Sequence, residues 1–312
     1  MKLGFLYAGQ GSQHPGMGED LYQEYETFRK VFDEKSVDFD LKQVCFSDPD
    51  GVLSQTEYTQ PCMVAFAAGI TAVLKEMGIE PAVAAGLSLG EYSALNAAGV
   101  WDSKTAVQIA AFRGQAMMKA SSGLDCAMTA VLGLDRESVR EACREASKFG
   151  IVEACNFNCE GNIAIGGETK AVEEASRLAK EKGAKRCVPL KVSGPFHTSI
   201  MRPAGDALRE YFKTIDFGEP SIPVLFNCLG KEMGPEDTIA GLLERQVQNS
   251  VYMEDCIARM AEMGIDAFVE IGPGKVLSGL VRKTVPKMHC YRVETAADIL
   301  ALAGAVKGEA GA

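Results

Sequence analysis

The chain has 312 residues, of which 47% are hydrophobic and 24% are charged, and its formal net charge is −10. This composition is typical of a globular protein with a sizeable core, and it excludes the disordered and fibrous classes. The acidic balance also disfavours a nucleic-acid-binding function, because such proteins usually present a basic face.

The cysteines and the apolar stretches indicate the compartment. The ten cysteines are scattered, and no CxxC pair occurs. The apolar run at residues 3–8 is too short for the core of a signal peptide, and no stretch approaches the ~20 apolar residues that cross a bilayer. We therefore expect reduced thiols, a cytoplasmic location and no membrane partner.

Strand and helix patterns alternate along the chain, which predicts an α/β fold with a largely parallel sheet. Strands are expected at residues 3–7, 82–85, 222–227 and 267–271. Helices are expected at residues 60–77, at 90–98, and from Asp102 or Ser103 to about residue 118. The tail from Ala303 is rich in Ala and Gly and is expected to be frayed.

Residues 125–192 follow a pattern of their own. Strand patterns at 127–132, 151–157, 162–165 and 186–192 alternate with helix patterns at 135–146 and 169–182. The order β-α-β-β-α-β is that of the ferredoxin-like arrangement. We therefore predict a small ferredoxin-like domain at 125–192, inserted into a large domain made of residues 1–124 and 193–312.

The sequence Gly86-Leu87-Ser88-Leu89-Gly90 has the form G-x-S-x-G, with a strand pattern before it and a helix pattern after it. This context is typical of a nucleophile elbow, in which flanking glycines avoid collisions at a sharp turn. We predict that Ser88 is a nucleophile. The N–H of Leu89 and the N–H of Gln10 are the candidate oxyanion donors. The competing interpretation is a simple tight turn.

A serine nucleophile needs a base, and the chain has three histidines. His197 lies in a turn directly after the predicted insert, and His14 in a loop near the first strand is its main rival. No Asp or Glu stands out as a third member. A backbone carbonyl could orient the imidazole instead, because the ring needs only an acceptor for its other N–H.

Arg113 falls in line with Ala106, Ala110 and Met117 at helical spacing, which is the apolar side of its helix. A guanidinium in that position needs an anionic partner, because an unpaired buried charge is costly. The planar fork of arginine matches a carboxylate. A carboxylate of the protein and a carboxylate of a substrate both remain open.

Several motifs taken together resemble the malonyl-CoA:acyl carrier protein transacylase family, over residues 3–280. They are AGQGSQ, GLSLGEYSAL, FRGQAM, SGPFH and EIGPGKVLSGL, in chain order. The resemblance implies an α/β-hydrolase-like large domain, with Ser88 as the acylated residue and His197, not His14, as the base. It also implies that Arg113 clamps the malonyl carboxylate and that Gln10 and Leu89 form the oxyanion hole.

The resemblance extends to other residues. It implies that the backbone carbonyl of Gln246 orients the histidine, with Gln248 as the alternative alignment. Phe196, beside the base, is predicted to crowd the acyl α-carbon, against the alternative of plain core packing. Exposed cations are candidates for contact with the carrier protein, against the alternative of ordinary solvated charges: Lys185, Arg186, Lys275, Arg282 and Lys283.

The implied partners are malonyl-CoA and an acyl carrier protein of fatty-acid synthesis, with no metal or other cofactor. Three alternatives remain. The first is a serine esterase or thioesterase of the α/β-hydrolase type, which shares the elbow but gives no role to Arg113. The second is an acyltransferase that supplies polyketide synthesis. The third is a non-catalytic protein that binds the carrier or acts as a scaffold, which would form no covalent adduct.

Overall fold

The computed structural model describes residues 1–309 and the side chains of residues 1–308. The chain divides into two compact units. Unit 1 comprises Met1–Gly114, Asp216–Leu225 and Ile257–Ala312, and unit 2 comprises Gln115–Ile215 and Phe226–Cys256. Three elements continue from one unit into the other: α5 (Ser103–Ser121), α10 (Met253–Glu262) and β7 (Leu225–Phe226).

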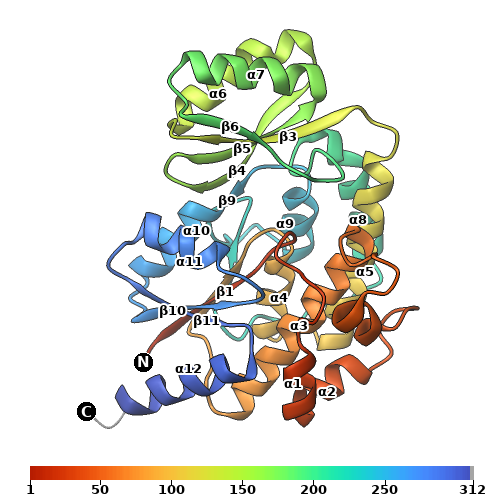
Figure 1. Cartoon of the computed structure of the whole chain (residues 1–312), viewed down its shortest axis with the longest axis vertical. Helices are drawn as coiled ribbons and strands as arrows, with labels where there is room; N and C mark the ends of the chain where they lie inside the picture. Colours follow the sequence, from red (N-terminus) through yellow and green to blue (C-terminus); the bar gives the residue numbers. More distant parts are fainter. Residues whose placement is uncertain (310–312) are drawn as a thin grey trace. The chain divides into compact units, whose positions relative to one another are not determined.

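Unit 1 is built on a parallel sheet of four strands in the order β11-β10-β1-β2 (Figure 1). The strands are β1 (Leu3–Tyr7), β2 (Val83–Gly86), β10 (Ala267–Ile271) and β11 (His289–Val293). Every residue of β1, β2 and β10 is buried, as expected for parallel strands covered on both faces. The predicted α/β fold with a parallel sheet is confirmed.

The helices of unit 1 match the predictions in part. They are α1 (Glu19–Glu24), α2 (Glu26–Asp33), the π-helical turn η1 (Gln43–Ser47), α3 (Thr56–Glu76), α4 (Gly90–Ala97), α11 (Val276–Thr284) and α12 (Ala296–Glu309). The predicted start of α3 at residue 60 is wrong. Pro61 lies inside this helix, which gives up one backbone hydrogen bond there.

Two expectations for the C-terminal part need correction. The predicted strand at 222–227 is reduced to β7, which pairs with β8 (Lys231–Glu232), because Pro223 has no N–H to donate to a ladder. The tail is not frayed from Ala303, since α12 continues to Glu309. Residues 310–312 of that tail lie outside the described residues.

Unit 2 contains a five-stranded sheet in the order β6-β3-β5-β4-β9. The strands are β3 (Cys126–Leu132), β4 (Val152–Cys159), β5 (Asn162–Glu168), β6 (Arg186–Pro189) and β9 (Val251–Tyr252). Pairs β3/β5, β3/β6 and β4/β5 are antiparallel, and β4/β9 is parallel. The strand predicted to reach residue 192 ends at Pro189.

Two helices, α6 (Arg136–Ala146) and α7 (Thr169–Glu181), lie together on one face of this sheet (Figure 1). Their apolar residues pack with those of the strands in one core that includes Val139, Phe157 and Val172. The other helices are η2 (Ser147–Phe149), η3 (Ser199–Met201), α8 (Arg202–Phe212) and α9 (Ile239–Gln246). In the described part of the chain, no helix has the length and hydropathy of a membrane span.

The predicted insert at residues 125–192 lies wholly inside unit 2, but unit 2 is larger. One physical reason is strand β9, which comes from residues 251–252 and extends the sheet of the insert by pairing with Asn156 and Phe157. Residues 115–124, 193–215 and 226–256, which the sequence analysis assigned to the large domain, group with the insert.

Candidate active site

Ser88 lies on a sharp turn between the end of β2 and the start of α4. Its φ of 53° is in the left-handed region, which a serine adopts only when its surroundings enforce it. A Cβ atom on Gly86 would lie 2.0 Å from the carbonyl carbon of Gly90, and one on Gly90 would lie 2.1 Å from the oxygen of Tyr7. Glycine is therefore required on both sides of the serine.

The loop after β1 packs directly against this turn. A Cβ atom on Gly9 would lie 2.5 Å from the backbone oxygen of Leu87. Gln10 follows in the same loop, and its side-chain Nε2 donates to Thr56 Oγ1 at 2.9 Å. Among the described residues, the backbone N–H groups of Gln10 and Leu89 donate to no other protein atom, so both are available to an oxyanion.

Arg113 is buried with 1% of its surface exposed, and its side chain contacts Ser88. Its Nη2 donates to Ser88 Oγ at 3.0 Å, and its Nη1 donates to Gln60 Oε1 at 2.9 Å. The guanidinium also lies over the ring of Tyr92, 5.1 Å from its centroid. Burial lowers the pKa of Arg113, while Tyr92 and the carboxylate of Glu91 act in the opposite direction.

Gln60 and Tyr92 were not identified from the sequence. Gln60 is fully buried in α3, and a polar residue in that apolar run was a signal that could have revealed it. Tyr92 is fully buried in α4, within the segment that carries the elbow. An arginine side chain over an aromatic face is stabilised by the ring quadrupole, so Tyr92 helps to fix the guanidinium.

In unit 2, His197 is 4% exposed and has a φ of 63°. Its Nδ1 donates to the backbone oxygen of Gln246 at 2.7 Å, since a carbonyl can only accept. This bond leaves Nε2 of a neutral ring as the acceptor that a general base requires. The alternative alignment on Gln248 is not favoured, because the oxygen that accepts from His197 Nδ1 is that of Gln246.

Phe196 precedes His197 and is 8% exposed. A Cβ atom on Gly194 would lie 3.1 Å from its ring, which indicates tight local packing. The predicted site residues thus fall into two groups. Ser88, Leu89, Gln10 and Arg113 belong to unit 1, whereas His197, Gln246 and Phe196 belong to unit 2.

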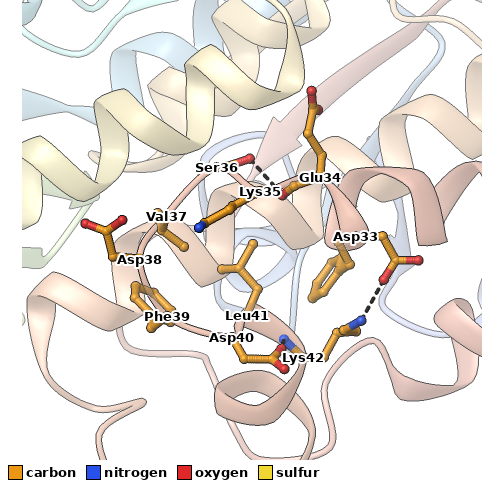
Figure 2. A pocket seen from close by; sticks show the side chains of 11 residues that line it. Asp33, Glu34, Lys35, Ser36, Val37, Asp38, Phe39, Asp40, Leu41 and Lys42 are labelled. Atoms are coloured by element: carbon orange, nitrogen blue, oxygen red, sulfur yellow. Dashed lines mark hydrogen bonds and ion pairs between the residues drawn. The ribbon is translucent and has the colours of Figure 1, made fainter.

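A hollow of about 300 Å³ in unit 1 is lined by none of these residues. Figure 2 shows the side chains that line it. One continuous segment, residues 32–42, lines it, and Lys42 Nζ pairs with Asp33 Oδ1 at 2.7 Å. None of the predicted site residues contributes to it. Within residues 1–309, no group of three or more His, Cys, Asp or Glu side chains is arranged to hold a metal ion.

The comparison with protein families decides the classification. The profile described as "Acyl transferase domain" matches residues 4–308. The chain belongs to the acyl transferase family. The turn that carries Ser88 and the buried Arg113 both lie within the matched residues.

Individual relatives are similar over almost the full length. A malonyl CoA-acyl carrier protein transacylase of Bacillus subtilis (strain 168) is 40% identical over 295 residues, covering 94% of this chain and 93% of that protein. The crystal structure of the transacylase of the same name from Clostridium perfringens has a TM-score of 0.96 at 36% identity, covering 99% and 98% of the two chains. A malonyl-transacylase solved in complex with its type II PKS acyl-carrier protein has a TM-score of 0.93 at 36% identity, covering 99% and 100%.

Proposed function

We propose that this protein transfers a malonyl group from malonyl-CoA to the phosphopantetheine thiol of an acyl carrier protein, through a malonyl ester on Ser88. The observation that carries the proposal is the buried guanidinium of Arg113, 3.0 Å from the Ser88 hydroxyl. An acyl group that carries a free carboxylate finds a matched cation beside the nucleophile. The names of the relatives are consistent with this substrate.

In the first half-reaction, Nε2 of His197 removes the proton of Ser88 as its oxygen attacks the thioester carbonyl. The backbone N–H groups of Gln10 and Leu89 stabilise the oxyanion that forms. When the intermediate collapses, the C–S bond breaks and protonated His197 gives its proton to the leaving thiol. The carbonyl of Gln246 supports the protonated ring in the role that a carboxylate plays in other serine enzymes.

The second half-reaction reverses these steps. The thiol of the carrier protein loses its proton to His197 and attacks the malonyl ester, and the Ser88 oxygen leaves and regains a proton. Water can also attack the malonyl ester and would then compete with the carrier-protein thiol. Transfer requires that the thiol reacts faster, so the malonyl-serine is expected to hydrolyse slowly. The reaction needs no cofactor beyond its two substrates.

Specificity follows from Arg113. An acetyl group offers no carboxylate, so its binding leaves the buried guanidinium without the partner that malonyl provides, and this penalises the wrong substrate. We propose that Phe196 crowds the acyl α-carbon and disfavours a methylmalonyl group. The tight packing around Gly194 and Phe196 supports a fixed position for the ring.

Intact-protein mass spectrometry tests the proposal. Mixing the protein with malonyl-CoA should add one malonyl increment to the wild type and none to Ser88→Ala, and a carrier-protein thiol should remove it. Acetyl-CoA and methylmalonyl-CoA should give less adduct. An adduct that survives in Ser88→Ala, or one that water removes as fast as the thiol does, contradicts the transferase and in the second case favours a hydrolase.

Several finer assignments belong to the same proposal. We propose an α/β-hydrolase-like arrangement for the large domain and a ferredoxin-like one for residues 125–192, supported by the parallel sheet of unit 1 and the antiparallel order β6-β3-β5-β4. The ten cysteines are free, which supports a reducing, cytoplasmic setting. We propose that the malonyl groups supply fatty-acid synthesis. The similarity to a transacylase bound to a type II PKS carrier protein keeps polyketide synthesis as a second candidate.

We propose that the carrier protein docks on exposed cations of α11 and the residue before it. Lys275, Arg282 and Lys283 are exposed, and none pairs with a carboxylate within residues 1–309. By contrast, exposed cations such as Lys30 and Arg144 are paired with Glu26 and Glu137. Unpaired cations on an acidic protein favour an acidic partner.

A further inference from the structure

His14, the rival histidine of the sequence analysis, makes two polar contacts in the loop between β1 and α1. Its Nε2 lies 2.7 Å from Glu294 Oε1, and its Nδ1 lies 3.0 Å from the backbone oxygen of Pro15. An ionised carboxylate and a carbonyl can only accept hydrogen bonds. Both contacts are therefore satisfied at once only when both ring nitrogens carry hydrogen, as in the imidazolium.

Glu294 links this loop to a further segment. Its second oxygen, Oε2, accepts from the N–H of Gly274 at 2.9 Å. His14 lies beyond the end of β1, Gly274 beyond the end of β10, and Glu294 directly after β11, and these strands are neighbours in one parallel sheet. One carboxylate thus connects the segments that leave the carboxyl ends of three adjacent strands.

The loop that contains His14 is held by backbone hydrogen bonds at its ends and by the Gln10–Thr56 and Gly11–Gln13 bonds between them, and it has free space around Gly11. The N–H of Ala8 donates to the oxygen of Ile271 at 3.0 Å, and the N–H of Gly16 donates to the oxygen of Cys45 at 2.9 Å. Between them, Gly11 has a φ of 112°, and no atom lies within 4 Å of the position of a Cβ there. The direction of the Gln10 N–H therefore depends on how this glycine-containing stretch is held.

We propose that protonated His14 and Glu294 form a brace that positions the loop carrying the Gln10 N–H, so that His14 is a positioning residue for the oxyanion hole. The brace assigns a role to a histidine that is not the base. It rests on the proposed acyl transfer only for its kinetic readout. The direct readouts, on the ring and the loop backbone, do not depend on any activity.

The brace is sensitive to pH. The hydrogen bond that His14 donates to Glu294 raises the pKa of His14, the bond to the carbonyl of Pro15 adds to this, and partial burial opposes it. Because the folded-state pKa is raised, the brace is complete below the ordinary histidine pKa of about 6.5 and is lost as the pH rises through the raised value.

Three other charged side chains lie on segments near the His14–Glu294 pair: Asp298, Asp20 and Lys275. Asp298 accepts from the N–H of Glu294 and Asp20 accepts from the N–H of Ala296, both at the start of α12. Lys275 follows Gly274 and is exposed. Glu294 is the charged group in hydrogen-bond contact with the His14 ring.

Nuclear magnetic resonance of the wild type and of Glu294→Gln tests the brace directly. The pKa of the His14 ring should fall in Glu294→Gln. Amide exchange at Gly11, whose N–H donates to Gln13 Oε1, should become faster relative to the intrinsic rate at the same pH, both in that variant and in the wild type above the His14 pKa. Lys42→Ala, which breaks the surface pair with Asp33, is the matched control and should change neither quantity. An unchanged His14 pKa in Glu294→Gln overturns the brace.

Transfer kinetics test its consequence. Below the ordinary histidine pKa, His14→Ala should lower kcat about tenfold with little change in KM, a part of the 10²–10³-fold that loss of a whole oxyanion donor costs. His14→Lys keeps a cation at all working pH values, so it should restore kcat and remove the decline that the wild type shows as His14 deprotonates. Identical pH profiles for the wild type, His14→Ala and His14→Lys overturn the positioning role.

The two proposals fail in different ways. If wild-type Ser88 takes up no malonyl group, the proposed function is wrong, and the pKa and amide-exchange measurements still decide the brace. If Ser88 is malonylated normally in His14→Ala and its kinetics match the wild type, the brace has no role in catalysis and the proposed function stands.

Discussion

Arg113 donates a hydrogen bond from Nη2 to Ser88 Oγ, so the cation that is proposed to select the substrate contacts the proposed nucleophile itself. Arg113 enters on α5 and Ser88 lies on the turn before α4, 25 residues earlier in the chain. The same guanidinium is held from the other side by Gln60 on α3. Recognition of a carboxylate and activation of a hydroxyl are therefore expected to depend on one another.

Replacing Arg113 by Ala should separate the two substrates. Malonyl transfer should fall about 100-fold or more in kcat/KM, because removing one partner of a buried, hydrogen-bonded charge pair costs roughly 2–5 kcal/mol. Acetyl transfer should be retained or rise, since the buried cation that favours a carboxylate-bearing acyl group is then removed. Steady-state kinetics with both thioesters measure this change in preference.

A matched control exists on α2. Arg29 donates to the backbone oxygens of Tyr22 and Gln23 and has no place in the proposed site, so Arg29→Ala should leave the ratio of the two activities unchanged. Unchanged malonyl kinetics in Arg113→Ala would refute the clamp.

The carboxylate introduced in Gln60→Glu should compete with the malonyl carboxylate for the guanidinium of Arg113. The new carboxylate would replace an amide oxygen that lies 2.9 Å from Arg113 Nη1 and would pair with the guanidinium. We expect malonyl kcat/KM to fall about tenfold or more while acetyl transfer changes little, since only malonyl needs the cation. Gln60→Met, which carries no charge, is the control and should reduce malonyl transfer less. If both variants behave alike, competition for the cation is not the cause.

The elbow makes a steric prediction. In Gly86→Ala the added Cβ would lie 2.0 Å from backbone of Gly90, so the strand–helix turn must open. We expect a loss of stability of about 3 kcal/mol or more, at the upper end of overpacking effects, together with loss of acylation at Ser88. Denaturant unfolding and mass spectrometry measure the two effects.

Gly304→Ala is the corresponding control, since no atom lies within 4 Å of its Cβ position in α12. It should raise stability by roughly 0.4–1 kcal/mol by restricting the unfolded chain, with acylation unchanged. Equal stabilities of Gly86→Ala and the wild type would show that the turn tolerates a side chain.

The buried strands could be predicted from the sequence because a short apolar run is visible in the strand's own residues. Strand β1 contains no charged residue, and Glu270 is the one charged residue in the otherwise apolar β10, so both runs are recognisable as buried strands. Strand β11 was not predicted, because its sequence contains the polar residues His289 and Arg292 and has neither an apolar run nor a regular alternation of buried and exposed residues. The sequence analysis left the N-cap of α5 open between Asp102 and Ser103. Thr105 N donates to Asp102 Oδ1 at 2.8 Å, which shows that Asp102 is the cap.

Candidate site residues with an unusual side-chain setting are easier to select from the sequence than a backbone acceptor is. Ser88 and Arg113 stand out because a serine between glycines and a cation on an apolar stripe are unusual. The carbonyl of Gln246 carries no residue-specific signal, so only the resemblance to a family pointed to it. The bond between His14 and Glu294 joins residues 280 positions apart, and no local pattern indicates it.

The cations near the start and along α11 give the last prediction. The triple variant Lys275→Ala, Arg282→Ala, Lys283→Ala should raise the KM for an acidic carrier protein about tenfold at low salt, and should flatten its dependence on salt, because screened surface charges act on encounter. Malonylation of Ser88 from malonyl-CoA, measured without the carrier protein, should stay unchanged. The double variant Lys30→Ala, Arg144→Ala removes cations that already have carboxylate partners and serves as the control. If the triple variant keeps the affinity and salt dependence of the wild type, the carrier protein docks elsewhere, and the exposed Lys185 and Arg186 of unit 2 become the next pair to neutralise.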